Sequence, residues 1–243
     1  MSICTVVRLG LVDYAEAWAL QKRLVAERAE GRIGDTLLLL EHPHTYTLGR
    51  SGKLEHLLMS QAERQARGVS VHWVDRGGDI TYHGPGQLVG YPIILVPYAL
   101  AALSPQDGRD RIPQADYVRY LRDIEEVIIR ALATFGVRGE RVAGYTGVWI
   151  GGEKIAAIGV KVNARGISSH GFALNVCPDL SYFAGIIPCG IPDRGVTSLE
   201  RVLGRPVTVD EVIPAVIAAF GEVFGCEMQI AEAPPFMVEF PIS

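Results

Sequence analysis

The chain has 243 residues, of which 49% are hydrophobic and 21% charged, and its formal net charge at pH 7 is −4. Such a composition is typical of a folded globular protein, and the acidic balance argues against a general nucleic-acid binder, which would carry a broad basic surface. No apolar run approaches the roughly 20 residues of a membrane-spanning helix, and residues 1–5 lack the pattern of a secretory signal. We therefore expect a cytoplasmic protein with neither a membrane nor a nucleic-acid partner.

The first elements along the chain are bounded by capping signals. Asp13 followed by Glu16 has the spacing of a capping box, in which side chains satisfy the first N–H groups of a helix. Ser60 and Glu63 repeat this spacing. Apolar runs between and after these pairs are typical of buried strands. The elements predicted here are a helix from Tyr14 to about Ala29, a strand at 36–40, a short helix that stops at Gly68, and a strand at 69–74.

The second half begins with a long helix and continues mainly with strands. Apolar residues at helical spacing run from about Gln114 to Phe135, and Gly136 provides the stop. The Gly151-Gly152 pair predicts a hairpin, which places Lys154 at the start of its second strand. The last predicted elements are a strand at 172–176 and a helix capped by Thr208 and Glu211, in which Pro214 fits only near the first turn.

This order of elements indicates a fold class. Strands dominate the middle of the chain and the helices alternate with them irregularly, which favours a mixed α+β sheet over a doubly wound one. No linker rich in Gly, Ser or Pro divides the chain. Residues 1–243 are therefore predicted to form one domain, with a minor C-terminal subdomain or extension from about residue 204.

The four cysteines are widely separated, and none belongs to a Cys-x-x-Cys pair; they are Cys4, Cys177, Cys189 and Cys226. A zinc site shows tighter ligand spacing, and a disulfide scaffold is shorter and richer in cysteine. A reducing compartment fits this pattern. Because most free thiols are packed in the core, a reactive cysteine has to be identified by its neighbours.

One of these cysteines has distinctive neighbours. Cys189 lies between a proline and a glycine, in a turn ahead of a predicted helix start near Ser198. A thiol in such a turn could be exposed and feel the positive end of the helix dipole. Cys177 closes an apolar strand and is expected in the core, and Cys4 and Cys226 are assigned to structure.

Two further segments carry unusual patterns. Residues 76–92 contain five glycines and two prolines in what would otherwise be strand, and glycines let a backbone approach a ligand closely. No helix follows them as in a dinucleotide loop, and the Lys-Ser/Thr ending of a phosphate loop is missing. The alternative is a series of tight turns between strands. The second segment is 168–176, which contains His170-Gly171.

At these three segments the sequence resembles the bacterial lipoate-protein octanoyltransferases, relatives of the lipoate- and biotin-protein ligases, from about Val12 to Leu203. The matching motifs are Glu41-His42-Pro43 with Thr47-Leu48-Gly49-Arg50, the whole of 76–92, Lys154-Ile155 with Ile158-Gly159, His170-Gly171 with Ala173-Leu174-Asn175-Val176, and Pro188-Cys189-Gly190 with Val196-Thr197-Ser198-Leu199. The resemblance implies a mainly antiparallel central sheet flanked by helices, as in biotin- and lipoate-protein ligases.

The resemblance also implies roles for individual residues. Cys189 would be the acyl-thioester nucleophile and Lys154 its catalytic partner. The acyl-substrate pocket would be lined by Arg76, Gly77, Gly78, Asp79, Ile80, Thr81, Tyr82, His83, Ala157, Ile158, Gly159, His170, Gly171, Phe172 and Ala173. The implied reaction moves octanoyl from octanoyl-acyl carrier protein to a lysine of lipoyl domains, in 2-oxoacid dehydrogenase E2 subunits and the glycine cleavage H protein. It requires no cofactor and no metal.

The proton transfers of the reaction give Lys154 a larger role than lowering the pKa of the thiol alone would. Lowering a cysteine pKa from about 8.5 to about 7 gains only about threefold in rate, because nucleophilicity falls as the thiolate fraction rises. An attacking lysine, with a pKa of about 10.4, is neutral in roughly one molecule in a few thousand near pH 7. We therefore hypothesise that Lys154 carries a proton from Cys189 to the departing carrier thiol, and then accepts one from the incoming amine.

Several alternatives remain open on the sequence alone. His83 and His170 are either structural histidines or members of a cysteine–histidine dyad that would replace Lys154 as base. Arg76 and Asp79 could simply pair at a turn. A zinc site formed by His170, Cys177 and Cys189 is also conceivable, although the ligand spacing is loose. An ATP-dependent lipoate or biotin ligase would share the fold and the lysine without needing a cysteine, and a binding module would hold acylated carrier protein without reacting.

Overall fold

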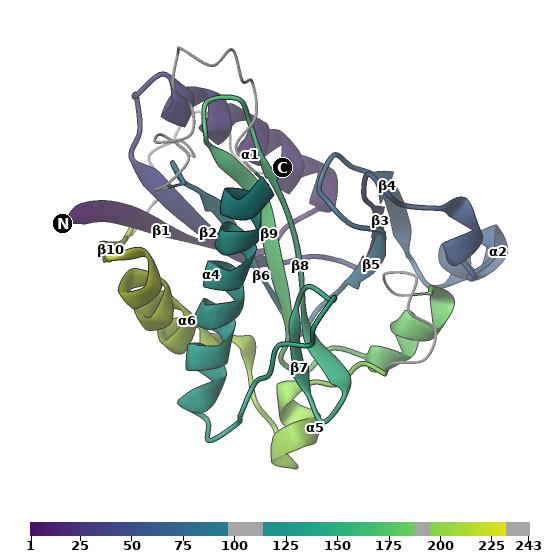
Figure 1. Cartoon of the computed structure of the whole chain (residues 1–243). Coiled ribbons are helices and arrows are strands. Elements are labelled where there is room, and N and C mark those ends of the chain that lie inside the picture. Colours follow the sequence, from purple (N-terminus) through teal and green to yellow (C-terminus); the bar gives the residue numbers. More distant parts are fainter. Residues whose placement is uncertain (97–113, 188–194, 232–243) are drawn as a thin grey trace.

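The computed structural model describes residues 1–96, 114–187 and 195–231. Its main sheet has seven strands in the order β10-β1-β2-β6-β9-β8-β7 (Figure 1). These strands are β1 (Ser2–Leu11), β2 (Asp35–Glu41), β6 (Gln87–Ile93), β7 (Val148–Ile150), β8 (Glu153–Val162), β9 (Ser168–Asn175) and β10 (Cys226–Ile230). β1 runs parallel to β2 and β10, and the other neighbours are antiparallel. The predicted mixed, mainly antiparallel sheet is confirmed.

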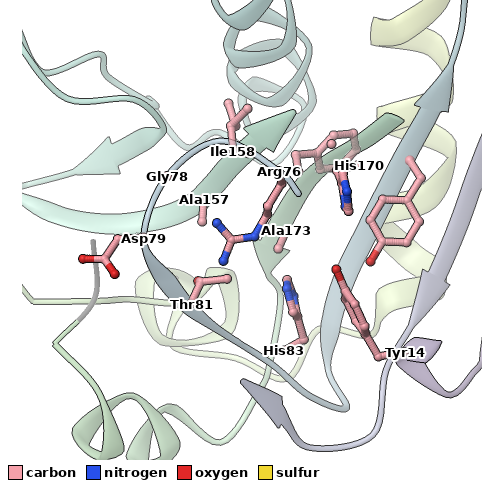
Figure 2. A pocket seen from close by; sticks show the side chains of 14 residues that line it. Tyr14, Arg76, Gly78, Asp79, Thr81, His83, Ala157, Ile158, His170 and Ala173 are labelled. Carbon is pink, nitrogen blue, oxygen red and sulfur yellow. The ribbon is translucent and has the colours of Figure 1, made fainter. Parts of the chain in front are cut away.

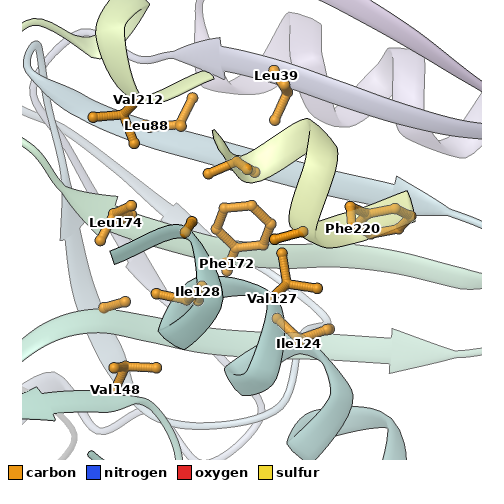
Figure 3. Packing of buried hydrophobic residues seen from close by; sticks show 14 of the residues in the cluster. Leu39, Leu88, Ile124, Val127, Ile128, Val148, Phe172, Leu174, Val212 and Phe220 are labelled. Carbon is orange, nitrogen blue, oxygen red and sulfur yellow. The ribbon is translucent and has the colours of Figure 1, made fainter. Parts of the chain in front are cut away.

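The leucine run of β2 is buried because helices cover both faces of the sheet. Leu37 and Leu39 belong to a core shared with α4 (Gln114–Ala133) and α6 (Val209–Phe224), whereas Leu38 and Leu40 pack toward α1 (Tyr14–Ala29). Successive side chains of a strand point to opposite faces, so a strand buried on both sides reads as an unbroken apolar run. Figure 3 shows the larger core, in which Phe172 and Leu174 of β9 meet residues of both α4 and α6.

A smaller sheet lies beside the main one, with the strand order β4-β3-β5 (Figure 1). Its strands are β3 (Thr45–Leu48), β4 (Ser70–Trp73) and β5 (Ile80–His83). Its core combines aromatic and aliphatic side chains, and Tyr46 and Tyr82 pack there against Tyr182 and Phe183 of the 3-10 helix η2 (Leu180–Gly185). The smaller sheet thereby fixes one end of η2, directly ahead of the segment that carries Cys189.

The capping signals correctly predicted most helix starts. Asp13 accepts backbone N–H groups at the start of α1, and Ser60 with Glu63 forms a capping box for α2 (Gln61–Ala66). Ser198 caps α5 (Leu199–Leu203), and Thr208 caps α6. No helix in the described part of the chain is long and apolar enough to cross a membrane.

Three features of the fold differ from the prediction. Pro214 lies in the second turn of α6 rather than near the first, on the exposed face of the helix, where water can reach the carbonyl that the proline leaves unpaired. β1, β3 and β10 were not predicted, and β9 begins four residues earlier than expected. In the C-terminal part of the chain, α6 packs on α4, and β10 pairs with β1. The predicted division of the chain at about residue 204 stays a prediction.

Candidate functional site

The glycine-rich segment and the two strands β8 and β9 enclose a cavity (Figure 2). Its lining consists of Tyr14, Arg76, Gly78, Asp79, Thr81, His83, Tyr91, Ala157, Ile158, Gly159, His170, Gly171, Phe172 and Ala173. Sequence segments far apart in the chain thus meet around one space. Their role in binding a substrate stays a prediction.

Three of the predicted lining residues lie elsewhere. Ile80 and Tyr82 point into the core of the smaller sheet, because side chains alternate along β5 and only Thr81 and His83 face the cavity. Gly77 instead joins the 76–79 loop to β8, since its N–H donates to the carbonyl of Val160 at 3.0 Å. The alternation of side chains along β5 would by itself have separated Thr81 and His83 from Ile80 and Tyr82.

Arg76 is buried across the cavity wall and is held mainly by Thr47. Its Nη2 donates to the carbonyl of Thr47 at 2.7 Å and to the Thr47 hydroxyl at 2.9 Å. Gly159 makes room for it, because a Cβ there would lie 3.0 Å from both Arg76 Cδ and the carbonyl of Gly77. A side chain at this position would therefore crowd the 76–79 loop where it approaches β8.

Asp79 organises the loop on which it lies. Its carboxylate accepts the backbone N–H groups of Lys53 at 3.3 Å and of Ile80 at 2.7 Å, and it also accepts from Nδ1 of His56. The carbonyl of His56 in turn accepts the N–H of Ile187 at 2.8 Å. One cavity residue is therefore linked to the last described residue before the segment that carries Cys189.

His83 has the contacts of a structural histidine. Its Nδ1–H donates to Gln87 Oε1 at 2.8 Å, and its Nε2 lies 3.3 Å from the Thr47 hydroxyl. Gln87 continues the network by donating to Asn175 Oδ1 at 2.9 Å. Burial holds the pKa of His83 well below its ordinary value. Both ring nitrogens are engaged, which favours the structural interpretation over a dyad with Cys189.

Lys154 is the second residue of β8, the second strand of the predicted hairpin, and it is buried. Its N–H donates to the carbonyl of Gly195 at 2.9 Å, and its carbonyl accepts the N–H of Thr197 at 3.0 Å. The stretch directly after residues 188–194 therefore runs beside Lys154. The Lys154 Nζ lies 4.7 Å from the centre of the Trp149 ring, a distance at which an aromatic face stabilises a cation.

A second hollow lies beside Lys154. It is lined by Lys154 and Val196, and it shares the lining residues Thr81, Ala157 and Ala173 with the cavity. Lys154 therefore lines a space that adjoins the cavity along β8 and β9. Cys189 itself lies outside the described residues.

The described cysteines carry no sign of a reactive thiol. Cys4 is buried, Cys177 and Cys226 are half-buried, and burial raises the pKa of all three. A thiolate is the reactive form of cysteine, so a raised pKa makes each of them a poor nucleophile near neutral pH. Among the described residues, no three His, Cys, Asp or Glu side chains are grouped so that they could hold a metal ion.

Sequence reasoning missed a buried carboxylate behind Lys154. Glu125 of α4 is fully buried, pairs with Arg122 and Arg141, and accepts the N–H of Gly147 at 3.0 Å. A Cβ on Gly147 would lie 3.4 Å from Lys154 Cε, so Glu125 fixes backbone that packs against the lysine. A glutamate within the apolar stripe of a helix was the available signal, because unpaired charges are rarely buried.

Two tyrosines that line the cavity were also missed, and they belong to a polar chain. The Nδ1–H of His42 donates to the carbonyl of Val12 at 2.7 Å, which leaves Nε2 to accept the hydroxyl of Tyr91, also at 2.7 Å. Tyr14 and Tyr91 are hydrogen-bonded to each other as well. Burial lowers the pKa of His42 from 6.5 to about 4.

This depressed pKa predicts acid sensitivity. Between about pH 6.5 and 4 the unfolded chain binds a proton at His42 that the folded chain does not, so the free energy of unfolding should fall as the pH falls, by up to about 3 kcal/mol. His42→Gln should be less stable at pH 7 and show a shallower decline. Urea unfolding of both proteins at several pH values measures this, and equal slopes would contradict it.

Comparison with known proteins places the chain in a class. Residues 13–221 match the model of the lipoyl protein ligase A/B catalytic domain. The fold resembles a bipartite lipoate protein ligase from Thermoplasma acidophilum, with a TM-score of 0.70 at 15% identity, covering 98% of this chain and 90% of that one. It also resembles lipoate-protein ligase A bound with ATP, with a TM-score of 0.66 at 16% identity, covering 96% of this chain and 89% of that one. The chain is therefore a catalytic domain of the lipoyl protein ligase A/B class.

More similar relatives identify the family within this class. An octanoyltransferase of Chloroflexus aurantiacus is 52% identical over 232 residues, which are 95% of this chain and 98% of that protein. An octanoyltransferase of Rubrobacter xylanophilus is also 52% identical, over 89% of this chain and 91% of its own length. The chain belongs to the octanoyltransferases, a family of acyltransferases.

Proposed function

We propose that this enzyme transfers an octanoyl group from octanoyl-acyl carrier protein to a lysine of a lipoyl domain through a thioester on Cys189. The acceptors would be the lipoyl domains of 2-oxoacid dehydrogenase E2 subunits and the glycine cleavage H protein. The names of the relatives support octanoyl transfer. The archaeal neighbour was solved as a lipoate protein ligase with its E2 lipoyl domain, which supports a lipoyl-domain acceptor.

One observation carries the proposal. The hydrogen bonds of Lys154 with Gly195 and Thr197 tie the catalytic candidate to the stretch that follows Cys189, and the hollow beside Lys154 shares Thr81, Ala157 and Ala173 with the cavity. The other flank, Ile187, is bonded to His56, which contacts Asp79 of the cavity. Both flanks of the Cys189 segment are thus anchored at the site, which supports a joint role of Cys189 and Lys154.

Two acyl transfers make up the proposed reaction. The Cys189 thiolate attacks the carbonyl carbon of the carrier thioester, and the C–S bond to the carrier breaks as the new C–S bond forms. Lys154 takes the thiol proton and gives it to the departing carrier thiol. The acceptor lysine then attacks the Cys189 thioester, an amide bond forms, and Cys189 leaves. Lys154 accepts the proton that the amine loses.

Neither transfer needs ATP. Transfer of an acyl group from one thiol to another is nearly isoenergetic, and its transfer from a thioester to an amine is downhill. An ATP-dependent ligase would instead activate a free acid, and the similarity to the ATP-bound ligase shows only a common fold. The source of the acyl group therefore separates the two functions.

The test is incubation of the chain with octanoyl-acyl carrier protein in the absence of ATP, followed by intact-mass measurement. We expect a mass gain of one octanoyl group, which disappears when a lipoyl domain is added and reappears on that domain. Free octanoate with ATP and magnesium serves as the comparison. Modification of the lipoyl domain only in that second mixture would replace the proposal with a ligase, and binding of the carrier without an adduct would indicate a binding module.

A further inference from the structure

His170 lines the cavity far from Lys154 along the paired strands β8 and β9. In the register of these strands, Ala157 is paired with Ala173 and Val160 with His170. Val160 lies six residues beyond Lys154, which is about 20 Å along a strand. In Figure 2, Asp79 lies on one side of the view and His170 and Tyr14 on the other, with Ala157 and Ala173 between them. His170 is thus far from Lys154 along these strands.

Two hydrogen bonds hold His170 in this position, and an ion pair holds one of its partners. Its Nε2–H donates to Asp75 at 2.8 Å, its backbone N–H donates to Gln21 Oε1 at 2.8 Å, and Lys161 binds the other oxygen of Asp75. The His170 side chain is only 2% exposed. A residue that is held at both its ring and its backbone can form a fixed wall that limits the length of the cavity.

His170 also carries two local penalties. Its φ of 54° is the only positive value at a non-glycine residue in the described part of the chain. Its Nδ1 is buried and has no hydrogen-bond partner among the described residues. Strained backbone and unpaired buried nitrogens persist in folded proteins mostly where function requires them. Their coincidence at a residue of the cavity wall indicates that the position of this ring matters.

The space in front of His170 has the length of a medium acyl chain. From Ala157, which lines both the hollow of Lys154 and the cavity, to Val160, the register partner of His170, the strand advances about 10 Å. An extended chain of eight carbons spans about 9 Å, given C–C bonds of about 1.5 Å. A longer chain would have to displace the His170 ring.

We infer that His170 ends the acyl cavity and sets the upper limit of acyl-chain length near eight carbons, an inference that rests on the proposed function. His170 then acts by shape, as a specificity-determining residue, and takes no part in proton transfer at the thioester. Asp75 and Gln21 are positioning residues that hold it.

The test compares hexanoyl-, octanoyl-, decanoyl- and dodecanoyl-acyl carrier protein as donors to the wild type and to His170→Gly. Glycine adopts the backbone angle of His170 without strain, so this variant removes the ring and relieves the penalty. We expect the decanoyl-to-octanoyl ratio of kcat/KM to rise about tenfold or more, because a pocket discriminates a single methylene by a factor of about ten or more. His44→Gln, a histidine outside the cavity, should keep the wild-type ratio.

A reciprocal variant keeps the inference testable if His170→Gly folds poorly. Ala173→Val narrows the middle of the cavity and should shift the preference toward hexanoyl, with the unfolding temperature as a check on folding. Unchanged ratios in either folded variant, with octanoyl still transferred by the wild type, would overturn the role of His170 alone. A wild type that accepts none of the four donors would overturn the proposed function instead.

Discussion

Replacing Cys189 with serine is expected to remove the octanoyl adduct and to lower turnover by about a thousandfold or more. A serine hydroxyl is a weak nucleophile unless a strong base activates it, and removal of a nucleophile eliminates the covalent route altogether. Intact mass after incubation with octanoyl-acyl carrier protein reports the adduct, and transfer to a lipoyl domain reports turnover. Any residual adduct on the serine variant would be an oxygen ester, which resists the neutral hydroxylamine that cleaves a thioester.

Cys177→Ser provides the matched control. Cys177 is half-buried at the end of β9, and burial raises its pKa, so its replacement should leave both adduct and turnover at wild-type levels. If the Cys189 variant kept a hydroxylamine-sensitive adduct, another thiol would be the nucleophile. Loss of the adduct in the Cys177 variant with retention in the Cys189 variant would identify that thiol.

The elements predicted correctly from sequence are those with local signals. α1 and α2 follow from caps at Asp13 and Ser60, and the β7–β8 hairpin follows from Gly151-Gly152. β1 and β10 lie toward the edge of the sheet. β1 has exposed residues among buried ones and β10 has no fully buried residue, so neither shows the continuous apolar run that marks β2. Their strand conformation is stabilised by pairing with residues distant in sequence, which no local window contains.

The cavity was predictable to a similar extent. Motifs shared with the family predicted most of the wall, but Tyr14 and Tyr91 line it only because α1 packs over β6 and β9. The placing of Ile80 and Tyr82 in the wall of the cavity was avoidable. The alternation of side chains along β5 already separates them from Thr81 and His83. The role of Glu125 could be predicted only in part. Its position on the helix is visible in the sequence, but its contact with Gly147 is not.

Lys154→Arg is expected to separate the two halves of the reaction. The guanidinium keeps the positive charge and can stack on Trp149 in place of the ammonium, so the acyl-enzyme should still form at a rate within about tenfold of wild type. Arginine cannot readily release or accept a proton, and general acid–base catalysis contributes about a hundredfold to ten-thousandfold. Transfer from the acyl-enzyme to a lipoyl domain should fall by that amount in a single-turnover experiment at pH 7, whereas Lys22→Arg, on the exposed side of α1, should transfer normally.

The pH dependence of that variant tests the reason for the loss. If Lys154 removes a proton from the attacking amine, the variant depends on amine that is already neutral. Its fraction rises about a hundredfold between pH 7 and 9, because the pKa of a free lysine is about 10.4. Transfer by Lys154→Arg should therefore recover strongly over this range, and the wild type should change much less. Equal rates for both proteins at pH 7 would rule out the proton shuttle, and a variant that stays slow at pH 9 would mean that Lys154 positions the acyl-enzyme rather than carrying its proton.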